Sequence, residues 1–496
     1  MELAMGQFSS YGSDKVWKAV PAVKGVGFGQ MIGTWSVVTY YCSLMALTVF
    51  YFVQSFNTVL PWTYCNPEWA DENCIDSAGN FTYTNESQSS SEQYFNNFVL
   101  KKIDNIDNGI GLPDWRLALC LLFSWIVLFF TLVKGVKSSG KVAYFTALFP
   151  YVVLFTLLGR GVSLPGAVNG IIFFINPQWH MLADPNFPCL NTLHTDAAEI
   201  HFTNSLSTVM HQSLSHSALT SDALAQDAWI ISLADTLTSL LAGFTIFSIL
   251  GNLAHELGAD VKDVVRGGSG LAFISYPDAL AKFDWVPQLF AVLFFLMLLT
   301  LGVCSAAGLT GNIITVIADQ VYIKLAICVS GFLLVLVYVT PGGQWILDLV
   351  DYFGGGFIIY VLVIVETVGI NYIYGMNNFI RDIKFMLGVD LGIYWKFCWA
   401  FFIPVSLTGI LLYILIDLRL PTFDGQEYPE IAYTCGWILS GVALGMLPIW
   451  FTHAVYIAEG STFTEKLMSV FRPKDTWGPK KMKNRKEWEK YIQNCQ

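Results

Sequence analysis

Apolar residues fall into long windows along the chain, and polar stretches separate these windows. Windows of about 20 residues, the length that crosses a bilayer as an α-helix, predict nine spans near residues 31–56, 115–134, 142–162, 229–251, 287–316, 324–339, 346–374, 394–416 and 432–457. The run from Leu289 to Val303, with its flanks, is typical of these windows. The pattern therefore predicts an all-α polytopic membrane protein.

The composition supports this class and excludes several others. Of the 496 residues, 54% are hydrophobic and 13% are charged, whereas soluble domains carry about 25% charged residues. A soluble enzyme and a disordered protein are therefore excluded, and the lipid bilayer is the expected partner. The formal net charge is −10 and the only dense basic stretch lies in the last 31 residues, so a nucleic-acid partner is unsupported.

The charges in the loops orient the predicted spans. Residues 57–110 hold eight acidic residues and only Lys101 and Lys102 as basic ones. The tail from Lys466 to Lys490 holds nine Lys and Arg residues and three acidic ones. Because basic loops stay on the cytoplasmic side, we expect the first loop outside the cell and the C-terminus in the cytoplasm.

This orientation conflicts with the number of predicted spans. Eight spans separate the outer loop from the tail, and an even number would return the chain to the side that it left. Residues 176–228 lie between two spans and contain no apolar window, although later loops alternate as if a crossing had occurred there. Charged groups at the bilayer centre cost about 2.5–3.5 kcal/mol each, so this polar segment is anomalous.

The outer loop carries candidates for two covalent modifications. Cys65 and Cys74 are nine positions apart, and Asn80 and Asn85 each begin an Asn-x-Ser/Thr sequence. Outside the cell oxidation is permitted and such sites accept sugars. We expect a disulfide between Cys65 and Cys74, with two free thiols as the alternative, and glycosylation of Asn80 or Asn85.

Polar groups inside the spans are the main functional signal, because such groups are costly unless they face an ion, a partner or water. Asp235 lies in a largely apolar window, and Ser239 is on the same helical face. Their oxygens suit a small cation, and a helix-packing hydrogen bond is the alternative. Gly354–Gly356 predicts an interrupted helix beside an aqueous vestibule. Glu366, further along the same span, receives no role.

Several motifs together resemble one family, the neurotransmitter:sodium symporters, and within it the insect sodium-dependent nutrient amino acid transporters. The motifs are Glu2-Leu3-Ala4-Met5-Gly6-Gln7-Phe8, Leu60-Pro61-Trp62, the Asp235 helix, Ala307 to Thr310, Tyr338-Val339-Thr340-Pro341-Gly342-Gly343 and Tyr374-Gly375. The resemblance covers residues 1–183 and 227–496. It implies the family's inverted-repeat fold of twelve helices, of which about nine are recognisable in this chain.

The resemblance also implies a division of the chain into four parts. Residues 1–183 resemble the end of the second helix and helices three to five, with the outer loop at 57–114. Residues 184–228 are an atypical polar segment in place of the sixth helix. Residues 229–457 resemble helices seven to twelve, and residues 458–496 form a basic cytoplasmic tail. The first helix, most of the second and a recognisable sixth are expected to be absent.

Site residues follow from the resemblance one position at a time. Sodium ligands are expected at Asp235, Ala307, Thr310 and Gly311, although Gly311 offers no side-chain oxygen. Ser239 matches a chloride ligand. The substrate carboxylate is expected at Tyr41, and the other residues expected to line the substrate pocket are Val37, Asn312 and Thr315. Asp351 resembles the acidic half of the outer gate and Asp319 that of the inner gate.

The resemblance implies transport, not catalysis: symport of amino acids across the plasma membrane, coupled to sodium and chloride, with no organic cofactor. The alternative is a non-transporting truncated isoform or gene-model product that acts at most as a binding or assembly partner. Because helices that complete the family's ion and substrate sites are expected to be absent, we expect the chain expressed alone to show no sodium-driven uptake.

Overall fold

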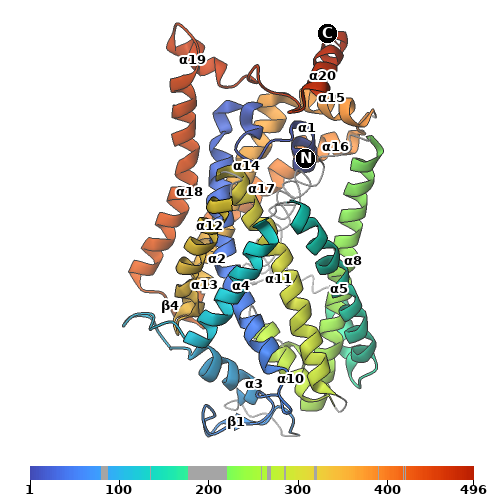
Figure 1. Ribbon diagram of the computed structural model, residues 1–496, viewed down its shortest axis with the longest axis vertical. Helices are drawn as coiled ribbons and strands as arrows, with labels where there is room; N and C mark the ends of the chain where they lie inside the picture. The colour runs from blue at the N-terminus through green and yellow to red at the C-terminus, as the bar shows by residue number, and fades with distance from the viewer. Residues whose placement is uncertain are drawn as a thin grey trace.

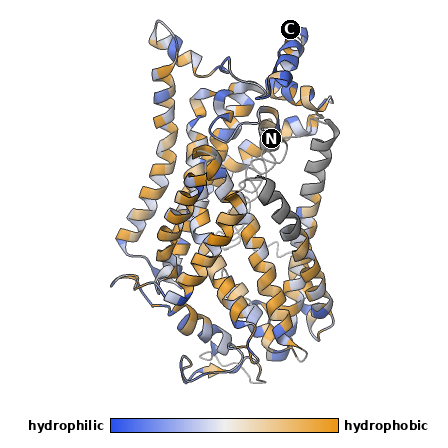
Figure 2. Ribbon diagram, in the orientation of Figure 1, coloured by the Kyte–Doolittle hydropathy of each residue, from blue (hydrophilic) through white to orange (hydrophobic). Residues whose placement is uncertain are grey.

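The computed structural model describes residues 1–79, 88–133, 136–176, 221–258, 260–264, 270–283, 286–317, 321–388, 390–416, 418 and 420–495. Long helices stand side by side and form one bundle (Figure 1). Apolar residues dominate these helices, and polar residues gather at the two ends of the bundle (Figure 2). This distribution is that of a protein whose middle lies in hydrocarbon.

Eight described helical segments are long and apolar enough to cross a membrane, or nine if the bent pair Leu148–Val162 and Ala167–Ile175 counts as one span. The long helices are α2 (Gly25–Gln54), α4 (Trp115–Val133), α5 (Val136–Val162), α8 (Ser221–Leu257), α11 (Pro287–Ile317), α12 (Val321–Val335), α14 (Ile358–Val368), α17 (Ile403–Ile416) and α18 (Glu430–Ile457). The predicted all-α polytopic class is confirmed, and each predicted window overlaps one candidate span, the window at 346–374 falling in the segment Gly343–Leu387.

Shorter elements mark the two ends of the bundle (Figure 1). Both termini lie at one end, which we call the tail end, with α1 (Glu2–Ser9), α15 (Met376–Leu387), α16 (Ile393–Phe397), α19 (Phe463–Ser469) and α20 (Met482–Cys495). The opposite end, the loop end, carries α3 (Ser90–Gln93), α10 (Tyr276–Ala281) and a parallel pair of strands, β1 (Cys74–Ile75) and β2 (Gln88–Ser89).

The remaining elements connect or extend the spans. They are α6 (Ala167–Ile175), α9 (Val261–Val264), α13 (Gly343–Val350), the antiparallel strands β3 (Thr422–Phe423) and β4 (Gln426–Glu427), the 3₁₀ segments Val16–Lys18, Pro21–Val23 and Leu336–Val339, and the π-helical segments Tyr94–Leu100, Leu271–Ser275, Asp351–Phe357, Gly369–Gly375 and Cys398–Phe402.

The outer loop is packed against the bundle by an aromatic cluster. Trp62 is fully buried, and its ring lies 5.3 Å from that of Tyr51 and 6.0 Å from that of Phe295. Cys65 and Cys74 form a disulfide, so the predicted pairing is confirmed. Asn80 and Asn85 lie outside the described residues.

A buried carboxylate ties this loop to α10. The carboxylate of Asp278 accepts hydrogen bonds from the hydroxyls of Ser77 (2.5 Å) and Ser89 (2.7 Å). Ser90 in turn donates to the carbonyl of Trp62 at 2.7 Å. Burial raises the pKa of Asp278 above its ordinary value of 3.8, even though the serine hydroxyls favour its charged form.

The raised pKa of Asp278 predicts a pH dependence of stability. The native state binds this proton more tightly than the unfolded state, so the contribution of Asp278 to stability is most favourable below its ordinary pKa and declines as pH rises through the raised value. In Asp278→Asn the group cannot titrate. We therefore expect the melting temperature of the wild type, relative to that of Asp278→Asn, to decrease as pH rises above about 4.

Thermal unfolding of the detergent-solubilised chain, followed by size-exclusion chromatography, measures this difference. Asp104→Asn, which removes an exposed carboxylate from the same loop, is the control and should follow the wild type. If the melting temperature of the wild type, relative to that of Asp278→Asn, rose with pH instead, the serine hydrogen bonds would outweigh the effect of burial on the pKa of Asp278.

The C-terminal tail folds back onto the tail end. Trp488 Nε1 donates to Asp382 Oδ1 at 3.0 Å, and Trp477 Nε1 donates to the Tyr374 hydroxyl at 2.9 Å. The ring of Phe8 on α1 lies 5.6 Å from that of Trp488. The sequence predicts only a basic tail here, whereas the structure gives these aromatic residues a docking site on α1 and α15.

α8 runs from one end of the bundle to the other, since it contacts α10 at the loop end and α15 at the tail end (Figure 1). α6 packs along the second half of α8, where Gly170 lies against Phe247 and Gly251. α6 therefore ends beside the second half of α8. The next described residue, Ser221, lies at the other end of α8. Residues 177–220, on which the predicted missing crossing falls, lie outside the described residues.

Candidate functional site

The candidate site lies where α2 packs against α11. The two helices are antiparallel, and a methyl group at Gly302 would lie 2.9 Å from Cγ of Met45. From this contact Tyr41 lies one turn toward the tail end on α2, and Ala306 lies one turn toward the tail end on α11. The helix pairing therefore brings the predicted substrate residue Tyr41 to the level of the predicted sodium residues.

The α11 residues of the predicted site are mostly buried. Ala307 is 4% exposed and Thr310 is fully buried, and the Thr310 hydroxyl has no hydrogen-bond partner among the described residues. Gly311 is half-buried, and a methyl group at this position would meet open space. Asn312 accepts a hydrogen bond from the Ser13 hydroxyl at 3.3 Å. An unsatisfied buried hydroxyl costs about 1–3 kcal/mol, so Thr310 marks a position where a further ligand would stabilise the protein.

The predicted outer-gate residue Asp351 packs against α2 one turn before Tyr41, near Val37 and Tyr40. Tyr40 donates a hydrogen bond to the carboxylate of Asp351. A methyl group at Gly355 would lie 3.2 Å from Asp351 Oδ1 and 3.7 Å from both the Tyr40 hydroxyl and Val37 Cγ2. Val37, Tyr40 and Asp351 thus converge on one glycine. Sequence reasoning selected Val37 and Asp351 but missed Tyr40.

The backbone around Asp351 differs from the prediction. The glycine run was expected to interrupt the helix, but Asp351–Phe357 continues it as a π-helical segment. A π-helix widens the turn and re-aims side chains without breaking the backbone hydrogen bonds. Glycine at 354 and 355 permits close contact, because a methyl group at Gly354 would lie 2.8 Å from Ser36 Cβ. The helix is therefore re-shaped, not interrupted.

The α8 residues of the predicted site stand apart from this group. Asp235 and Ser239 are exposed on α8, which packs mainly on α5 and α6. Of the segment expected in place of the family's sixth helix, residues 184–228, the structure describes only residues 221–228, which belong to α8. The shared-cavity hypothesis for Asp235 and Ser239 therefore stays a prediction. The Thr315 side chain and Asp319 also lie outside what the structure describes.

A buried carboxylate that sequence reasoning left without a role has a clear partner. Glu366 is 6% exposed, and its Oε2 accepts a hydrogen bond from Gln30 Nε2 at 2.7 Å. Gln30 lies on α2 and Glu366 on α14. A buried carboxylate in a span needs a polar neighbour. Gln30, a polar residue next to an apolar window, was the available signal for such a neighbour.

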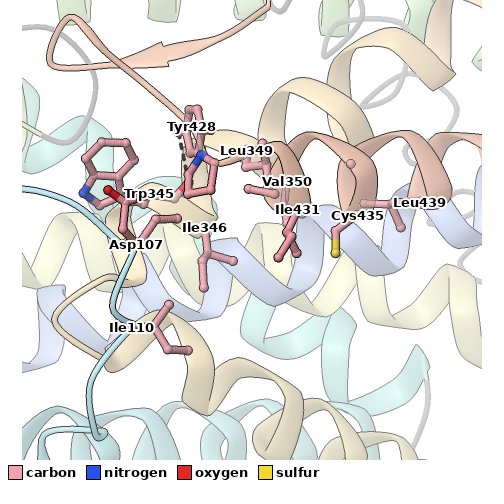
Figure 3. Close-up of a pocket in the computed structure, with 15 residues that line it drawn as sticks. Asp107, Ile110, Trp345, Ile346, Leu349, Val350, Tyr428, Ile431, Cys435 and Leu439 are labelled. Atoms are coloured by element: carbon pink, nitrogen blue, oxygen red, sulfur yellow. Dashed lines mark hydrogen bonds between the residues drawn. The ribbon is translucent and has the colours of Figure 1, made fainter.

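A pocket of about 440 Å³ lies between the outer loop, α13 and α18, and it is lined mainly by apolar side chains (Figure 3). Asp107 lies on the loop side and Cys435 on α18, while the Tyr428 hydroxyl donates to the carbonyl of Trp345 at 3.0 Å. The pocket contains none of the predicted site residues. It is therefore separate from the α2–α11 site.

Comparisons with known proteins point to one family. Residues 1–458 match the sodium:neurotransmitter symporter family. The sodium-dependent nutrient amino acid transporter 1 of Drosophila pseudoobscura pseudoobscura is 44% identical over 519 residues, which cover 98% of this chain and 78% of the relative. The proteins of the same name in Drosophila mojavensis (44% identical, 98% and 79% covered) and Drosophila melanogaster (43% identical, 98% and 80% covered) are similar as well.

The family match spans most of the chain, and the relatives cover nearly all of it. The family consists of membrane transporters, so the chain is not an enzyme. The resemblance drawn from the motifs is therefore confirmed. This chain belongs to the sodium:neurotransmitter symporter family.

Proposed function

We propose that the helices of this chain belong to a sodium-coupled amino acid symporter of the plasma membrane. Family membership and the printed function of the Drosophila relatives support this proposal. The observation that carries it is the Thr310 hydroxyl, which is fully buried on α11 without a hydrogen-bond partner among the described residues. A cation at this position would receive an oxygen ligand that the protein otherwise leaves unsatisfied.

The chemistry of the α2–α11 pair suits this task. Sodium is a hard cation and, like calcium, prefers oxygen ligands. The Thr310 hydroxyl and the nearby Ala307 carbonyl are such ligands, and the Tyr41 hydroxyl on α2 is a donor for a substrate carboxylate. Each positive charge that moves inward across 100 mV contributes about 2.3 kcal/mol to accumulation of the substrate.

Chloride is the proposed second coupled ion, with Ser239 as its ligand and Asp235 in a sodium site. Support for these two roles comes from the family resemblance. Asp351, which accepts the hydrogen bond from Tyr40, is the proposed outer-gate acid, and Asp319 is its proposed counterpart at the inner gate.

The role of Thr310 can be tested in a chimera. The chimera keeps residues 1–176 and 221–496 of this chain and takes every other segment from a Drosophila relative. We expect sodium-dependent amino acid uptake by this chimera. Thr310→Val should raise the sodium concentration for half-maximal uptake by roughly tenfold to a hundredfold, because loss of one oxygen ligand to a cation is comparable to loss of a hydrogen bond to a charged group, about 1.5–3 kcal/mol.

Thr300→Val is the matched control on the same helix. Its hydroxyl donates to the carbonyl of Met297 at 2.8 Å, so the substitution should leave the sodium dependence unchanged. Equal sodium dependence in Thr310→Val and Thr300→Val would refute the proposed sodium site.

The proposed orientation places the disulfide loop outside the cell and the basic tail in the cytoplasm. We expect sugar on Asn80 or Asn85, so enzymatic deglycosylation of the membrane-expressed chain should increase its mobility on a gel. The double variant Asn80→Gln/Asn85→Gln should show no such shift. A wild-type chain whose mobility does not depend on these residues would count against the orientation.

We further propose that the 496 residues alone supply only part of the ion and substrate sites. Among the described residues, Thr310 lacks a partner and Gly311 borders open space, while Asp235 and Ser239 are exposed. These groups offer too few convergent oxygens for a dehydrated cation.

A further inference from the structure

A pocket of about 1,020 Å³ lies at the tail end of the bundle, and none of the predicted site residues lines it. Three parts of the chain form its walls: residues 14–24 before and at the start of α2, the last turns of α18 with the residues that follow, and residues 464–476 of the tail. A ligand in this pocket would contact the N-terminal segment, a span and the tail at the same time.

Backbone hydrogen bonds hold the N-terminal segment and the tail together at this pocket. The amide of Ala22 donates to the carbonyl of Val470 at 3.0 Å, and the amide of Lys474 donates to the carbonyl of Lys18 at 3.0 Å. Trp17, 2% exposed, lies in the same wall. The walls are therefore positioned by the fold and do not depend on flexible side chains.

Cationic side chains line the walls formed by the N-terminal segment and by the tail. They are Lys15, Lys18, Lys24, Arg472 and Lys474. Lys24 is close enough to Lys15 and Lys474 to experience their positive charges. A bound polyanion would be attracted by all five cations and would reduce the repulsion between them.

Four acidic residues line the pocket beside the five basic ones, and one of them caps a helix. Glu465 accepts hydrogen bonds from the Ser461 hydroxyl (2.7 Å) and from the Thr462 amide (3.3 Å) in the capping box of α19. Asp14 lies beside Lys24. Glu459 and Asp475 complete the set and can accept hydrogen bonds from hydroxyl groups of a ligand.

The pocket lies at the depth of lipid headgroups. The span that includes α2 begins at Pro21 and α18 ends at Ile457, so Lys24 and the end of α18 mark one membrane boundary. Just beyond it, Phe463 and Met468 on α19 are 71% and 67% exposed. Exposed apolar side chains next to basic ones are typical of a segment that rests on a membrane surface.

We propose that this pocket binds the headgroup of a phosphorylated inositol phospholipid in the adjacent leaflet. The headgroup carries several phosphates for the five cations and ring hydroxyls for Glu459 and Asp475, and its acyl chains would extend beside α18. A basic pocket at the cytoplasmic end of a span is a recognised setting for such lipids. The proposal rests on the orientation proposed above, which puts the tail end in the cytoplasm.

Binding is measured on the full chain in nanodiscs of phosphatidylcholine with phosphatidylinositol 4,5-bisphosphate, by native mass spectrometry and by titration. The triple variant Lys15→Gln/Arg472→Gln/Lys474→Gln changes three exposed side chains of the pocket. Each basic residue near a membrane contributes about 1 kcal/mol to binding of anionic lipid, so affinity should fall at least tenfold.

A second triple variant, Lys483→Gln/Lys486→Gln/Lys490→Gln, removes the same charge from exposed positions of α20 outside the pocket. It should bind like the wild type, and both variants should match the wild-type melting temperature in phosphatidylcholine alone. If the two triple variants lost affinity for the lipid equally, the overall charge and not the pocket would attract the lipid. That result would overturn the proposal. Equal affinity for soluble inositol 1,4,5-trisphosphate would also overturn it in favour of a soluble ligand. None of these readouts requires transport.

Discussion

Replacing Gly170 by Ala should remove most of the folded protein from the membrane. A methyl group at Gly170 would lie against the carbonyl oxygen of Phe247 and 2.9 Å from Cα of Gly251. These atoms are backbone of α8, which cannot rotate away as a side chain could. Overpacking typically costs about 1–3 kcal/mol, occasionally more, and backbone contacts of this kind belong at the upper end. Fluorescence-detected size-exclusion chromatography of a tagged chain measures the monodisperse fraction.

Gly159→Ala is the matched control, because it adds the same methyl group to the neighbouring helix α5, where nothing lies within 4 Å. Gly in a helix is less stable than Ala by about 0.5–1 kcal/mol, so this variant should be as abundant as the wild type or more so. If the monodisperse fraction of Gly170→Ala equalled that of Gly159→Ala, the result would contradict the close packing of α6 against α8.

The spans could be predicted from the sequence because the hydrocarbon imposes one rule on every crossing segment. The predicted window at 287–316 differs from α11 by one residue, and the window at 115–134 differs from α4 by one. The window at 31–56 missed the start of α2 at Gly25. Three of the six residues from Gly25 to Gln30 are glycines, which weaken the hydropathy signal, so the predicted window began later.

Packing between spans followed less directly from the sequence. Gly354–Gly356 indicated an interruption, but local composition cannot distinguish a break from a π-helical turn, which depends on neighbours such as Ser36. Tyr40 and Tyr41 are adjacent and chemically alike. Only the packed α13–α14 segment shows that Tyr40 reaches Asp351.

The tail illustrates contacts that no local pattern reveals. Its charges indicated a basic segment, yet the residues that dock it are Trp477 and Trp488. Their partners, Tyr374 and Asp382, lie about a hundred positions away in the sequence. Because such a pairing depends on the whole fold, the sequence alone could not predict it.

The second large effect concerns transport by the 496-residue chain on its own, which we expect to be absent. A sodium site needs several oxygens, since hard cations such as calcium take six to eight. The described α11 residues offer the Thr310 hydroxyl and backbone carbonyls, and the α8 residue Asp235 is exposed. The remaining ligands would have to come from elements that the described helices do not include.

The substrate side leads to the same expectation. Tyr41 offers a single hydroxyl, which contributes about 0.5–1.5 kcal/mol net, or up to about 3 kcal/mol to a charged group. Micromolar recognition requires about 8 kcal/mol. A chain that relies on this contact alone would bind an amino acid too weakly to couple it to a sodium gradient.

Uptake of a radiolabelled mixture of amino acids into cells or liposomes that contain the chain, with sodium replaced by choline as the control, tests this account most directly. Surface biotinylation and the chimera described above establish that the chain is present and that the assay works. The account predicts uptake that is the same in sodium and in choline for the 496-residue chain. Saturable uptake that disappears in choline would show that these residues form a complete site and would contradict the account.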